Sequence, residues 1–365
     1  MYYVGLMSGT SMDAVDAALV EFGNNAKLVH YQEYSIEQSL RRKVRSIDET
    51  TPLGQVAEID NQLGHLFASA VNRLLENANV ASDQVFAIGS HGQTILHRPN
   101  GNNTNSIQIA DPNIICAETG ITTVADFRRM DIAFGGQGAP LASAFHQYQF
   151  QQESKSLVIL NIGGIANITL LPSNDNKVIG FDTGPGNGLL DDWVQLHKSE
   201  EFDKNSAWAN SGKEIPELLN LLLSDDYFTI APPKSSGREY FNLEWLNENI
   251  AKFNSSPNAE DVQATLLKLT VRSICDAINN VATEYDEVLL CGGGAYNPAF
   301  STLIQECLPD MKVSTTDDYG LTPDCIEAVT FAWLAKQRME NKTANLADVT
   351  GASREVLLGG VYASN

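Results

Sequence analysis

Four glycine-rich turns are the segments of this sequence best suited to hold phosphate groups. They are SGTS at residues 8–11, NIGG at 161–164, GFDTGPGN at 180–187 and CGGGA at 291–295, and each follows a stretch typical of a β-strand. Glycine lets the backbone turn sharply and approach a ligand, and the hydroxyl and N–H groups of such a turn can surround phosphate oxygens. The nucleotide contacts expected from the last three turns are Gly163, Gly164, Gly184, Gly186, Asn187, Gly292, Gly293 and Gly294.

One such turn often serves only to connect a strand to a helix. Four of them favour nucleotide binding, because ligands of α/β sheets collect at the carboxyl ends of strands. The sequence contains no GxxxxGK[ST] motif and no GxGxxG after the first strand. This excludes the commonest nucleoside triphosphatase and dehydrogenase motifs.

Asp182 is the carboxylate that we expect to act in catalysis. It leaves a strand that ends at Phe181 and enters a turn in which Gly184 and Gly186 permit close approach. A carboxylate there can take a proton from an attacking hydroxyl or water while a phosphoryl group is transferred. The alternative is that Asp182 caps the helix beginning near Gly188. Capping does not explain the whole DTGPGN segment, so catalysis is the preferred interpretation.

Other polar side chains also follow predicted strands. His91 and Thr94 follow a strand at residues 85–88, and Arg128 follows one at 122–125. His91 and Thr94 fit a ligand-contacting loop or an ordinary polar loop equally well. The planar guanidinium of Arg128 could orient an anionic or hydroxyl-rich ligand, or form a surface salt bridge.

Three further charged residues have two interpretations each. Glu327 lies in the first turn of the last predicted helix, where an acid also complements the helix dipole. Lys234 and Arg238, in the stretch PPKSSGREY, belong either to a mobile loop that faces the nucleotide or to a solvated turn. The sequence alone does not decide between these readings.

The elements that must position these residues occur twice in the same order. In the first half, alternation and turn residues predict strands at 2–6, 14–22, 27–35, 85–88 and 122–125, and apolar spacing predicts helices at 53–77 and 112–119. In the second half, strands are predicted at 156–162, 166–171, 177–181, 287–291 and 312–315, and helices after 186 and at 297–307 and 325–338.

This repeat predicts two similar α/β domains that face each other across a cleft. We expect the N-terminal domain at residues 1–130 plus 345–365 and the C-terminal domain at 131–344. The stretch 128–152, which contains GGQGAP, is the expected hinge.

The composition is that of a globular protein with a strong acidic excess. The chain has 365 residues and a formal net charge of −21, which opposes binding to nucleic acid or to anionic membranes. Its five cysteines are scattered, which is typical of free thiols in a reducing compartment. The start lacks signal-peptide features, and no apolar run approaches membrane-spanning length. We therefore expect a soluble cytoplasmic protein.

Ordered motifs give the chain a strong resemblance to one family. LMSGTSMD near the start, SHGQT at 90–94, ADFR at 125–128, GGQGAPL at 135–141, NIGGIAN at 161–167, GFDTGPGN, CGGGAYNP at 291–298 and TGASR at 350–354 resemble the anhydro-N-acetylmuramic acid kinases. The resemblance implies the duplicated, ribonuclease H-like fold of the sugar kinase, heat-shock chaperone ATPase and actin superfamily. It also implies a homodimer that acts in peptidoglycan recycling and amino sugar catabolism.

The implied reaction uses ATP, water and Mg²⁺ to turn 1,6-anhydro-N-acetylmuramic acid into N-acetylmuramic acid 6-phosphate. Asp182 matches the base that activates water, and His91, Thr94, Arg128 and Glu327 match sugar-site residues. The resemblance assigns ATP contacts to Gly9, Thr10, Ser11, Met12, Asp13, Ala14, Val15 and Asp16.

Two positions depart from the pattern. Met7 stands where the superfamily's first phosphate loop has an acid, so Asp13 or Asp182 would have to approach Mg²⁺ through water. Ala14 replaces a glycine, which matters only if that position needs a positive φ. Two alternatives stay open: a nucleotide-gated binding or chaperone-like module, and a kinase for a related amino sugar without the anhydro bridge.

Overall fold

The computed structural model describes residues 1–9, 12–173, 177–252, 257–281 and 285–364. The chain divides into two compact units, one made of Met1–Gln149 and Cys325–Asn365 and the other of Phe150–Asp324. These bounds differ from the predicted ones: residues 131–149 and 325–344 belong to the first unit. The reason lies in their packing, since Phe145 and Tyr148 stack on Trp333 at ring-centroid distances of 6.1 and 5.8 Å.

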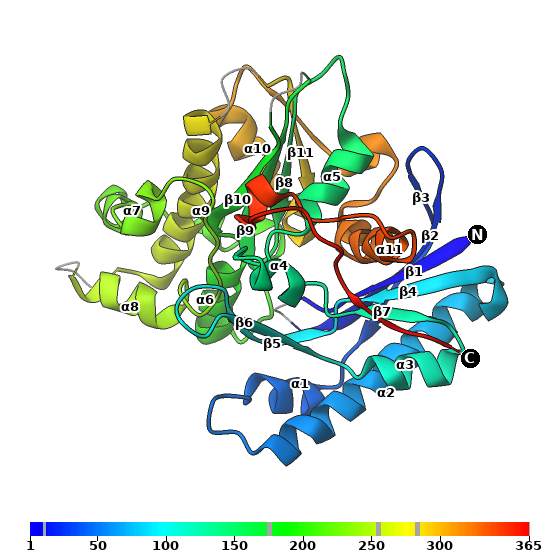
Figure 1. The fold of residues 1–365 in the computed structure, drawn as a ribbon. Coiled ribbons are helices and arrows are strands. Elements are labelled where there is room, and N and C mark those ends of the chain that lie inside the picture. Colours follow the sequence, from blue (N-terminus) through cyan, green and yellow to red (C-terminus); the bar gives the residue numbers. More distant parts are fainter. Residues whose placement is uncertain (10–11, 174–176, 253–256, 282–284, 365) are drawn as a thin grey trace. The chain divides into compact units, whose positions relative to one another are not determined.

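The first unit is built on a mixed sheet with the strand order β13-β7-β4-β1-β2-β3 (Figure 1). Its strands are β1 (Tyr2–Met7), β2 (Ala14–Phe22), β3 (Ala26–Ser35), β4 (Val85–Ser90), β7 (Thr123–Ala125) and β13 (Gly360–Tyr362). The first three strands pair antiparallel, whereas β4 is parallel to β1 and to β7. A separate hairpin pairs β5 (Gln93–Arg98) with β6 (Asn105–Ile109).

The second unit repeats this arrangement. Its strands are β8 (Leu157–Ile162), β9 (Ile165–Leu171), β10 (Ile179–Pro185), β11 (Glu287–Cys291) and β12 (Lys312–Thr315). Their order is β10-β9-β8-β11-β12, with β8, β9 and β10 antiparallel and β8, β11 and β12 parallel. This order is that of β3-β2-β1-β4-β7 in the first unit, so the predicted duplicated α/β fold is confirmed.

The helices that were predicted from long patterns of apolar residues are present in the structure. In the first unit they are α1 (Gln38–Arg45), α2 (Leu53–Ala78), α3 (Pro112–Thr119), α4 (Arg129–Ala133), α5 (Ala142–Phe150), α11 (Ile326–Met339) and α12 (Ala347–Thr350). In the second they are α6 (Gly188–Lys198), α7 (Pro216–Leu223), α8 (Leu243–Lys252), α9 (Ala259–Val281) and α10 (Pro298–Cys307). The sequence analysis did not identify α9 or the β5–β6 hairpin. No helix in the described ranges combines the length and apolar character needed to cross a bilayer.

Successive residues of β1 point to opposite faces of the first sheet. Val4 and Leu6 join the apolar core that includes residues of α2, while Gly5 lies against α11 (Figure 1). A Cβ atom at Gly5 would lie 1.8 Å from the backbone carbonyl oxygen of Ala328 in α11. Gly89 of β4 meets α11 in the same way. Glycine at these positions lets the helix backbone rest directly on the strands.

Glu287 forms a buried polar network at the start of β11 in the second unit. Its side chain is 2% exposed, and it accepts hydrogen bonds from Lys312 Nζ and Ser314 Oγ at 2.7 Å, and from Lys155 Nζ and Tyr319 OH at 3.0 Å. Burial raises the pKa of this carboxyl, but the hydrogen bonds outweigh burial and lower it to about 2.

This network gives a prediction on stability. Glu287→Gln should lower the free energy of unfolding by about 2 kcal/mol at pH 7, because hydrogen bonds to a charged acceptor are lost. The native pKa lies below the ordinary value of 4.5, so the stabilisation is complete above that pH and is lost as pH falls toward 2. Urea unfolding at pH 7 and pH 3 measures this, with the exposed Glu306→Gln as control. An equal difference between wild type and Glu287→Gln at both pH values would contradict the prediction.

Candidate active site

The first phosphate-binding turn follows β1 in the first unit. Ser8 is buried, and its hydroxyl donates to Gln93 Oε1 at 2.8 Å, while Gly9 accepts the Met12 N–H at 3.2 Å. Met12 has a φ of 56°, which few residues other than glycine adopt without cost. Thr10 and Ser11, both predicted ATP contacts, lie outside the described residues. A Cβ at Gly9 would meet no atom within 4 Å, so the backbone there is open to a ligand.

The predicted contacts at residues 13–16 lead from this turn into β2. Ala14 begins the strand and lacks a positive φ, so alanine fits there without strain. Asp13 is exposed and its Oδ1 pairs with Arg41 Nη1 at 2.7 Å, and Asp16 accepts the Tyr31 hydroxyl at 3.0 Å. Val15 is buried in the core. Asp13 precedes β2, and Asp16 lies within it, opposite Met7 of β1.

Arg128 and His91 form a hydrogen-bonded pair. This pair favours the interpretation that Arg128 contacts a ligand over the interpretation that it forms a surface salt bridge. Arg128 is half-buried, and its Nε and Nη2 lie 3.1 and 3.0 Å from His91 Nε2, while Nη1 donates to the Gly138 carbonyl at 2.7 Å. Because a guanidinium can only donate, His91 Nε2 must accept, and the ring is neutral with its proton on Nδ1. Burial, and then the charge of Arg128, place the pKa of His91 well below its ordinary value.

The β5–β6 hairpin adds residues that the sequence analysis missed. Residues 91–94 were read as a loop, but Gln93 and Thr94 already belong to β5. His97 Nδ1 lies 3.0 Å from Ser106 Oγ, and Gln108 Nε2 donates to Thr94 Oγ1 at 3.1 Å. Burial, and then Arg128, lower the pKa of His97 to about 4.

Polar atoms without partners are the strongest sign of a ligand in this cluster. Within the described ranges, Ser90 Oγ, His91 Nδ1 and His97 Nε2 are buried and lack a hydrogen-bond partner. A buried polar atom left unpaired costs about 1–3 kcal/mol. A hydroxyl-rich ligand could satisfy these three atoms. The alternation of side chains along β5 could have suggested His97 as a site residue. Its contact with Ser106 could not be predicted, because it depends on the loop between β5 and β6, which the sequence does not define.

Glu327 lies in the first turn of α11 and is half-buried. Phe331, one turn later, stacks on His91 with ring centroids 4.6 Å apart. Residues four apart share one helix face, so Glu327 lies on the face of α11 that carries this contact. The structure thus places all four predicted sugar-site residues in the first unit.

The GGQGAP loop and the C-terminal TGASR segment hold Arg128 in place. Asp131 is fully buried, and its carboxylate accepts hydrogen bonds at 2.7 Å from the Gly138 N–H, Asn345 Nδ2 and the Thr350 hydroxyl. Gly138 in turn accepts from Arg128. Two motifs far apart in sequence therefore fix one guanidinium.

Asp182, in the second unit, sits at a bulge in β10, where the pairing with β9 shifts between Asp182 and Gly184. The side chain is half-buried, and its Oδ2 accepts the Ser236 N–H at 2.9 Å. Its own N–H donates to the Lys234 carbonyl at 3.2 Å. Asp182 therefore lies within a strand and does not cap α6, whose N-cap residue is Asn187, so the capping alternative is wrong.

The glycines after Asp182 pack against the protein itself. A Cβ at Gly184 would lie 2.8 Å from the Phe228 ring, and one at Gly186 would lie 2.3 Å from the Gly163 carbonyl oxygen. The N–H groups of Gly186 and Asn187 donate to the carbonyls of Gly164 and Gly163 at 3.0 and 2.7 Å. These amides are engaged within the unit, which differs from the expected open phosphate turn.

The last glycine-rich turn, after β11, offers a more open backbone. A Cβ at Gly293 would meet no atom within 4 Å, and this residue is exposed. Gly292 has a φ of +74°, and a Cβ at Gly294 would lie 2.5 Å from the Ile162 side chain. Gly292 and Gly294 thus shape the turn, and Gly293 is the position that faces open space.

Comparisons with known proteins show the family to which the chain belongs. The family model described as anhydro-N-acetylmuramic acid kinase matches residues 1–364. The chain belongs to this family. A relative of that name from Shewanella oneidensis is 50% identical, covering 100% of this chain and 99% of that protein. One from Pasteurella multocida is 47% identical, covering 99% and 97%.

Among solved structures, the chain is similar to the activator of a 2-hydroxyisocaproyl-CoA dehydratase from Clostridium difficile with bound ADPNP. The TM-score is 0.46 and the sequence identity 14%, over 93% of this chain and 96% of that one. As a member of the anhydro-N-acetylmuramic acid kinase family the chain is an ATP-using phosphotransferase, as predicted.

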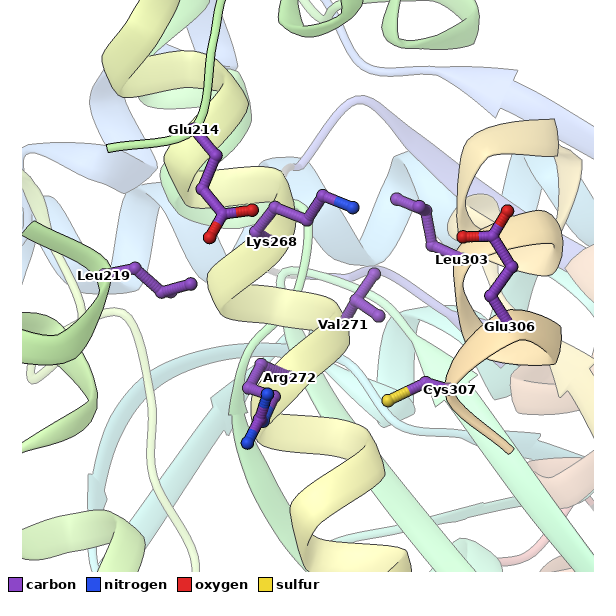
Figure 2. A pocket seen from close by; sticks show the side chains of 8 residues that line it. All are labelled: Glu214, Leu219, Lys268, Val271, Arg272, Leu303, Glu306 and Cys307. Carbon is purple, nitrogen blue, oxygen red and sulfur yellow. The ribbon is translucent and has the colours of Figure 1, made fainter. Parts of the chain in front are cut away.

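A hollow on the second unit of this kinase lies away from the predicted residues. It has a volume of about 260 Å³ and lies between α9, α10 and the region of α7 (Figure 2). Its lining residues are Glu214, Leu219, Lys268, Val271, Arg272, Leu303, Glu306 and Cys307. None of them is a residue that the family motifs assign to ATP or sugar.

Proposed function

We propose that this chain uses ATP and water to convert 1,6-anhydro-N-acetylmuramic acid to N-acetylmuramic acid 6-phosphate, with ADP as second product. The family match over nearly the whole chain and the names of the relatives support this substrate. The single observation that carries the mechanism is the Asp182 carboxylate, half-buried at the β10 bulge with one oxygen fixed by the Ser236 amide.

Asp182 acts as the general base. It takes a proton from water, and the hydroxide formed attacks the anomeric carbon, so that the bond from this carbon to the bridging oxygen breaks. The bridging oxygen leaves with the bonding electron pair and attacks the γ-phosphorus of ATP, and ADP departs. The proton taken up by Asp182 is then released to solvent. The leaving group of the first step is thus the nucleophile of the second.

The sugar is recognised by the polar cluster of the first unit, through His91, Thr94, Arg128 and Glu327. Arg128 is held rigid by its bonds to His91 and Gly138, so it orients the ligand without losing side-chain freedom on binding. Neutral His91 offers the proton on Nδ1 to a hydroxyl or carbonyl oxygen. These contacts specify the sugar, while Asp182 performs the proton transfer.

The phosphates of ATP bind at the turn from Gly9 to Asp16 and at the glycine-rich turns of the second unit. The open backbone at Gly9 and Gly293 supports direct contact there. Gly184 and Gly186 support the site by close packing instead, because their neighbours leave no space for side chains. The glycines of the four turns therefore have two proposed roles: some contact the phosphates, and others permit close packing of the backbone.

The residues of this chain fit Mg²⁺ that binds together with the nucleotide. Among the described residues, no three His, Cys, Asp or Glu side chains gather in a metal-binding group, and Met7 is buried where an acid was expected. Mg²⁺ usually combines one or two carboxylates with substrate phosphates and waters. Asp13 or Asp182 is the carboxylate that we propose to contact it through water. When bound, Mg²⁺ neutralises charge on the transferred phosphoryl group.

A homodimer in the cytoplasm, acting in peptidoglycan recycling, completes the proposal. ATP is available in this compartment, and Cys116, Cys275, Cys291, Cys307 and Cys325 are all free thiols, as expected in a reducing environment. Sedimentation analysis of the purified protein tests the oligomeric state.

An isotope experiment tests the reaction. The anhydro-sugar, ATP and Mg²⁺ are incubated with the enzyme in ¹⁸O-water, quenched early, and the product is analysed by mass spectrometry with fragmentation. We expect one ¹⁸O at the anomeric hydroxyl and none in the phosphate group. Unlabelled product kept in the same water for the same time corrects for spontaneous exchange at this carbon. Product without anomeric label would overturn the hydrolytic mechanism, and turnover of N-acetylmuramic acid itself at an equal rate would favour a kinase for ordinary amino sugars.

A further inference from the structure

The β6 strand of the β5–β6 hairpin turns polar side chains inward and an apolar one outward. Ser106 is fully buried and Gln108 is half-buried, while Ile107 between them is 37% exposed. A strand that covers an apolar core shows the opposite order, with its apolar side chains inside. The inner face of the hairpin therefore does more than fill the core, and its polar groups need polar partners.

A bulge in β5 brings polar residues of both strands to this inner face. Thr94 pairs with Gln108 and His97 pairs with Ser106, and the register shifts between Thr94 and Leu96. Residues three apart point to opposite faces of a regular strand, but the extra residue of a bulge places them on the same one. Thr94 and His97 therefore lie on one face of the hairpin, together with their partners on β6.

Hydrogen bonds join the four side chains of this inner face. Gln108 Nε2 donates to Thr94 Oγ1 at 3.1 Å and to Ser106 Oγ at 2.7 Å. Ser106 Oγ in turn lies 3.0 Å from His97 Nδ1. Thr94 is one of the residues that the family motifs match to the sugar. Since His97 is held on the same face, we expect a ligand that covers this face to contact both.

The base of the hairpin connects this inner face to the other sugar-site residues. β5 follows His91 closely, and a Cβ atom at Gly92 would lie 2.6 Å from the Ile109 carbonyl oxygen at the end of β6. Arg128 bonds to His91, and its charge also lowers the pKa of His97. His91, Arg128 and His97 thus border one polar region of the first unit.

The contacts of Ser106 determine which nitrogen of His97 carries the proton. The Ser106 hydroxyl donates its single proton to the Leu96 carbonyl at 3.3 Å and accepts from Gln108 Nε2. The remaining lone pair of this hydroxyl can only accept, so His97 Nδ1 donates to it. Burial, and then the charge of Arg128, lower the pKa of His97 to about 4, so the ring is neutral at pH 7. His97 Nε2 therefore presents a lone pair.

This lone pair complements the donors of the same site. Among the described residues, nothing donates a hydrogen bond to His97 Nε2, although the atom is buried. Arg128 and His91 Nδ1 can only donate, so they suit carboxylate or carbonyl oxygens. His97 Nε2 can only accept, so it suits an N–H or O–H group. The anhydro-sugar has two such groups, the acetamido N–H and the hydroxyl at C4, because its lactyl carboxyl is ionised at pH 7.

We propose that His97 is a specificity residue, whose Nε2 accepts a hydrogen bond from the acetamido N–H or the C4 hydroxyl of the bound sugar. This rests on the proposed function, because it takes the anhydro-sugar as the ligand. The β5–β6 hairpin is then one wall of the sugar site and discriminates against ligands that lack the donor. His97 binds the sugar and takes no part in proton transfer.

Two substitutions separate this role from a purely structural one. Asparagine places its amide where Nδ1 lies, so His97→Asn keeps a donor for Ser106 and lacks the acceptor at Nε2. Glutamine reaches the position of Nε2, so His97→Gln keeps an acceptor and loses the Ser106 contact. We expect His97→Asn to lower kcat/KM for the anhydro-sugar about 10- to 100-fold, chiefly through KM, and His97→Gln to stay within about fivefold of wild type. The reverse order would show that His97 only supports the hairpin, and would overturn the inference.

The KM for ATP should stay within about twofold in both variants, because the proposed phosphate contacts lie at other turns. His65→Asn, which changes an exposed histidine of the same unit, is the matched control and should keep wild-type kinetics. Thermal unfolding shows whether each variant is folded. Wild-type kinetics in a folded His97→Asn would refute the role of His97.

Sugar analogues test the inference on the wild-type protein, so that it can be decided even if the variants do not fold. Calorimetry without ATP compares the anhydro-sugar with an analogue that lacks the C4 hydroxyl and with one that has an ester oxygen in place of the amide N–H. One of the two should bind wild type about 10- to 100-fold more weakly than the sugar itself, but bind His97→Asn as well as the sugar does. Equal binding of all three compounds by wild type would overturn the inference.

Binding and turnover together distinguish this inference from the proposed function. If wild type phosphorylates the anhydro-sugar and a folded His97→Asn does so equally well, the role of His97 alone is refuted. If wild type neither binds nor phosphorylates this sugar, the proposed function is refuted, and the role of His97 with it.

Discussion

Asp182→Asn should lower the rate of sugar phosphate formation by about 10³-fold, the middle of the range for loss of a general base. Asparagine has the shape of aspartate and can still accept the Ser236 N–H, so the β10 bulge should persist. It cannot take a proton from water at neutral pH. The affinity for ATP should change by less than about twofold, because the open backbone that we propose for direct phosphate contact is at Gly9 and Gly293, outside the strand that carries Asp182. Product formation is measured by chromatography and ATP affinity by calorimetry.

The matched control is Asp226→Asn, which removes an exposed carboxylate from the same unit. It should retain the wild-type rate and the wild-type melting temperature. If Asp182→Asn formed sugar phosphate at the wild-type rate, Asp182 would not be the base. If it lost ATP binding as well, its role would be structural and the mechanism would need another proton acceptor.

Gly5→Ala should destabilise the protein by about 3 kcal/mol or more, which is large for one methyl group. The added Cβ would lie 1.8 Å from the Ala328 carbonyl oxygen and 2.7 Å from the Ala332 nitrogen, both backbone atoms of α11. A backbone cannot rotate away as a side chain can, so the whole helix must shift from β1. Because α11 carries Glu327 and Phe331, activity should fall with stability. Urea unfolding and the KM for the sugar measure the two effects.

Gly54→Ala provides the control within the same unit. Gly54 lies in the exposed first turn of α2, and a Cβ there would meet no atom within 4 Å. Alanine at this position should leave stability unchanged or raise it by up to about 0.5 kcal/mol. Equal effects of the two substitutions would show that the contact between β1 and α11 is not close-packed in solution.

The sequence predicted most strands because their evidence is local. β2, β11 and β12 have the predicted bounds, since apolar alternation and flanking turn residues mark both ends. The same local reasoning placed Asp182 near the end of the third strand of the second repeat. It also predicted that the two repeats share one order of elements along the chain, and the sheets show that their strands share one order in space as well.

The residues that hold Asp182 could not be predicted in this way. Ser236 and Tyr227 reach it through contacts between distant parts of the chain, and nothing in PPKSSGREY indicates which strand it covers. His97 escaped notice for the same reason, because it depends on pairing with Ser106 across the hairpin. Such contacts arise from tertiary packing, which local patterns do not encode.

Glycines were the other source of error. A glycine that exposes backbone to a ligand and one that admits a neighbouring carbonyl look alike in sequence. Gly293 is open, whereas Gly186 lies against the Gly163 carbonyl. The domain bounds also shifted, because α5 and α11 pack together although residues 151–325 lie between them. Only the three-dimensional arrangement distinguishes these cases.

The first unit is assembled from both ends of the chain, which has a consequence for biosynthesis. Residues 150–324 form the second unit without interruption, so that unit leaves the ribosome before α11 and β13 emerge. Until then, the strands β1 and β4 lack the helix that rests on Gly5 and Gly89, and β7 lacks its edge partner. Domains generally fold as units during synthesis, so residues 1–149 are synthesised first but complete their folding last. A released fragment that ends at residue 324 should therefore resist proteolysis in its second unit while its first unit is still digested.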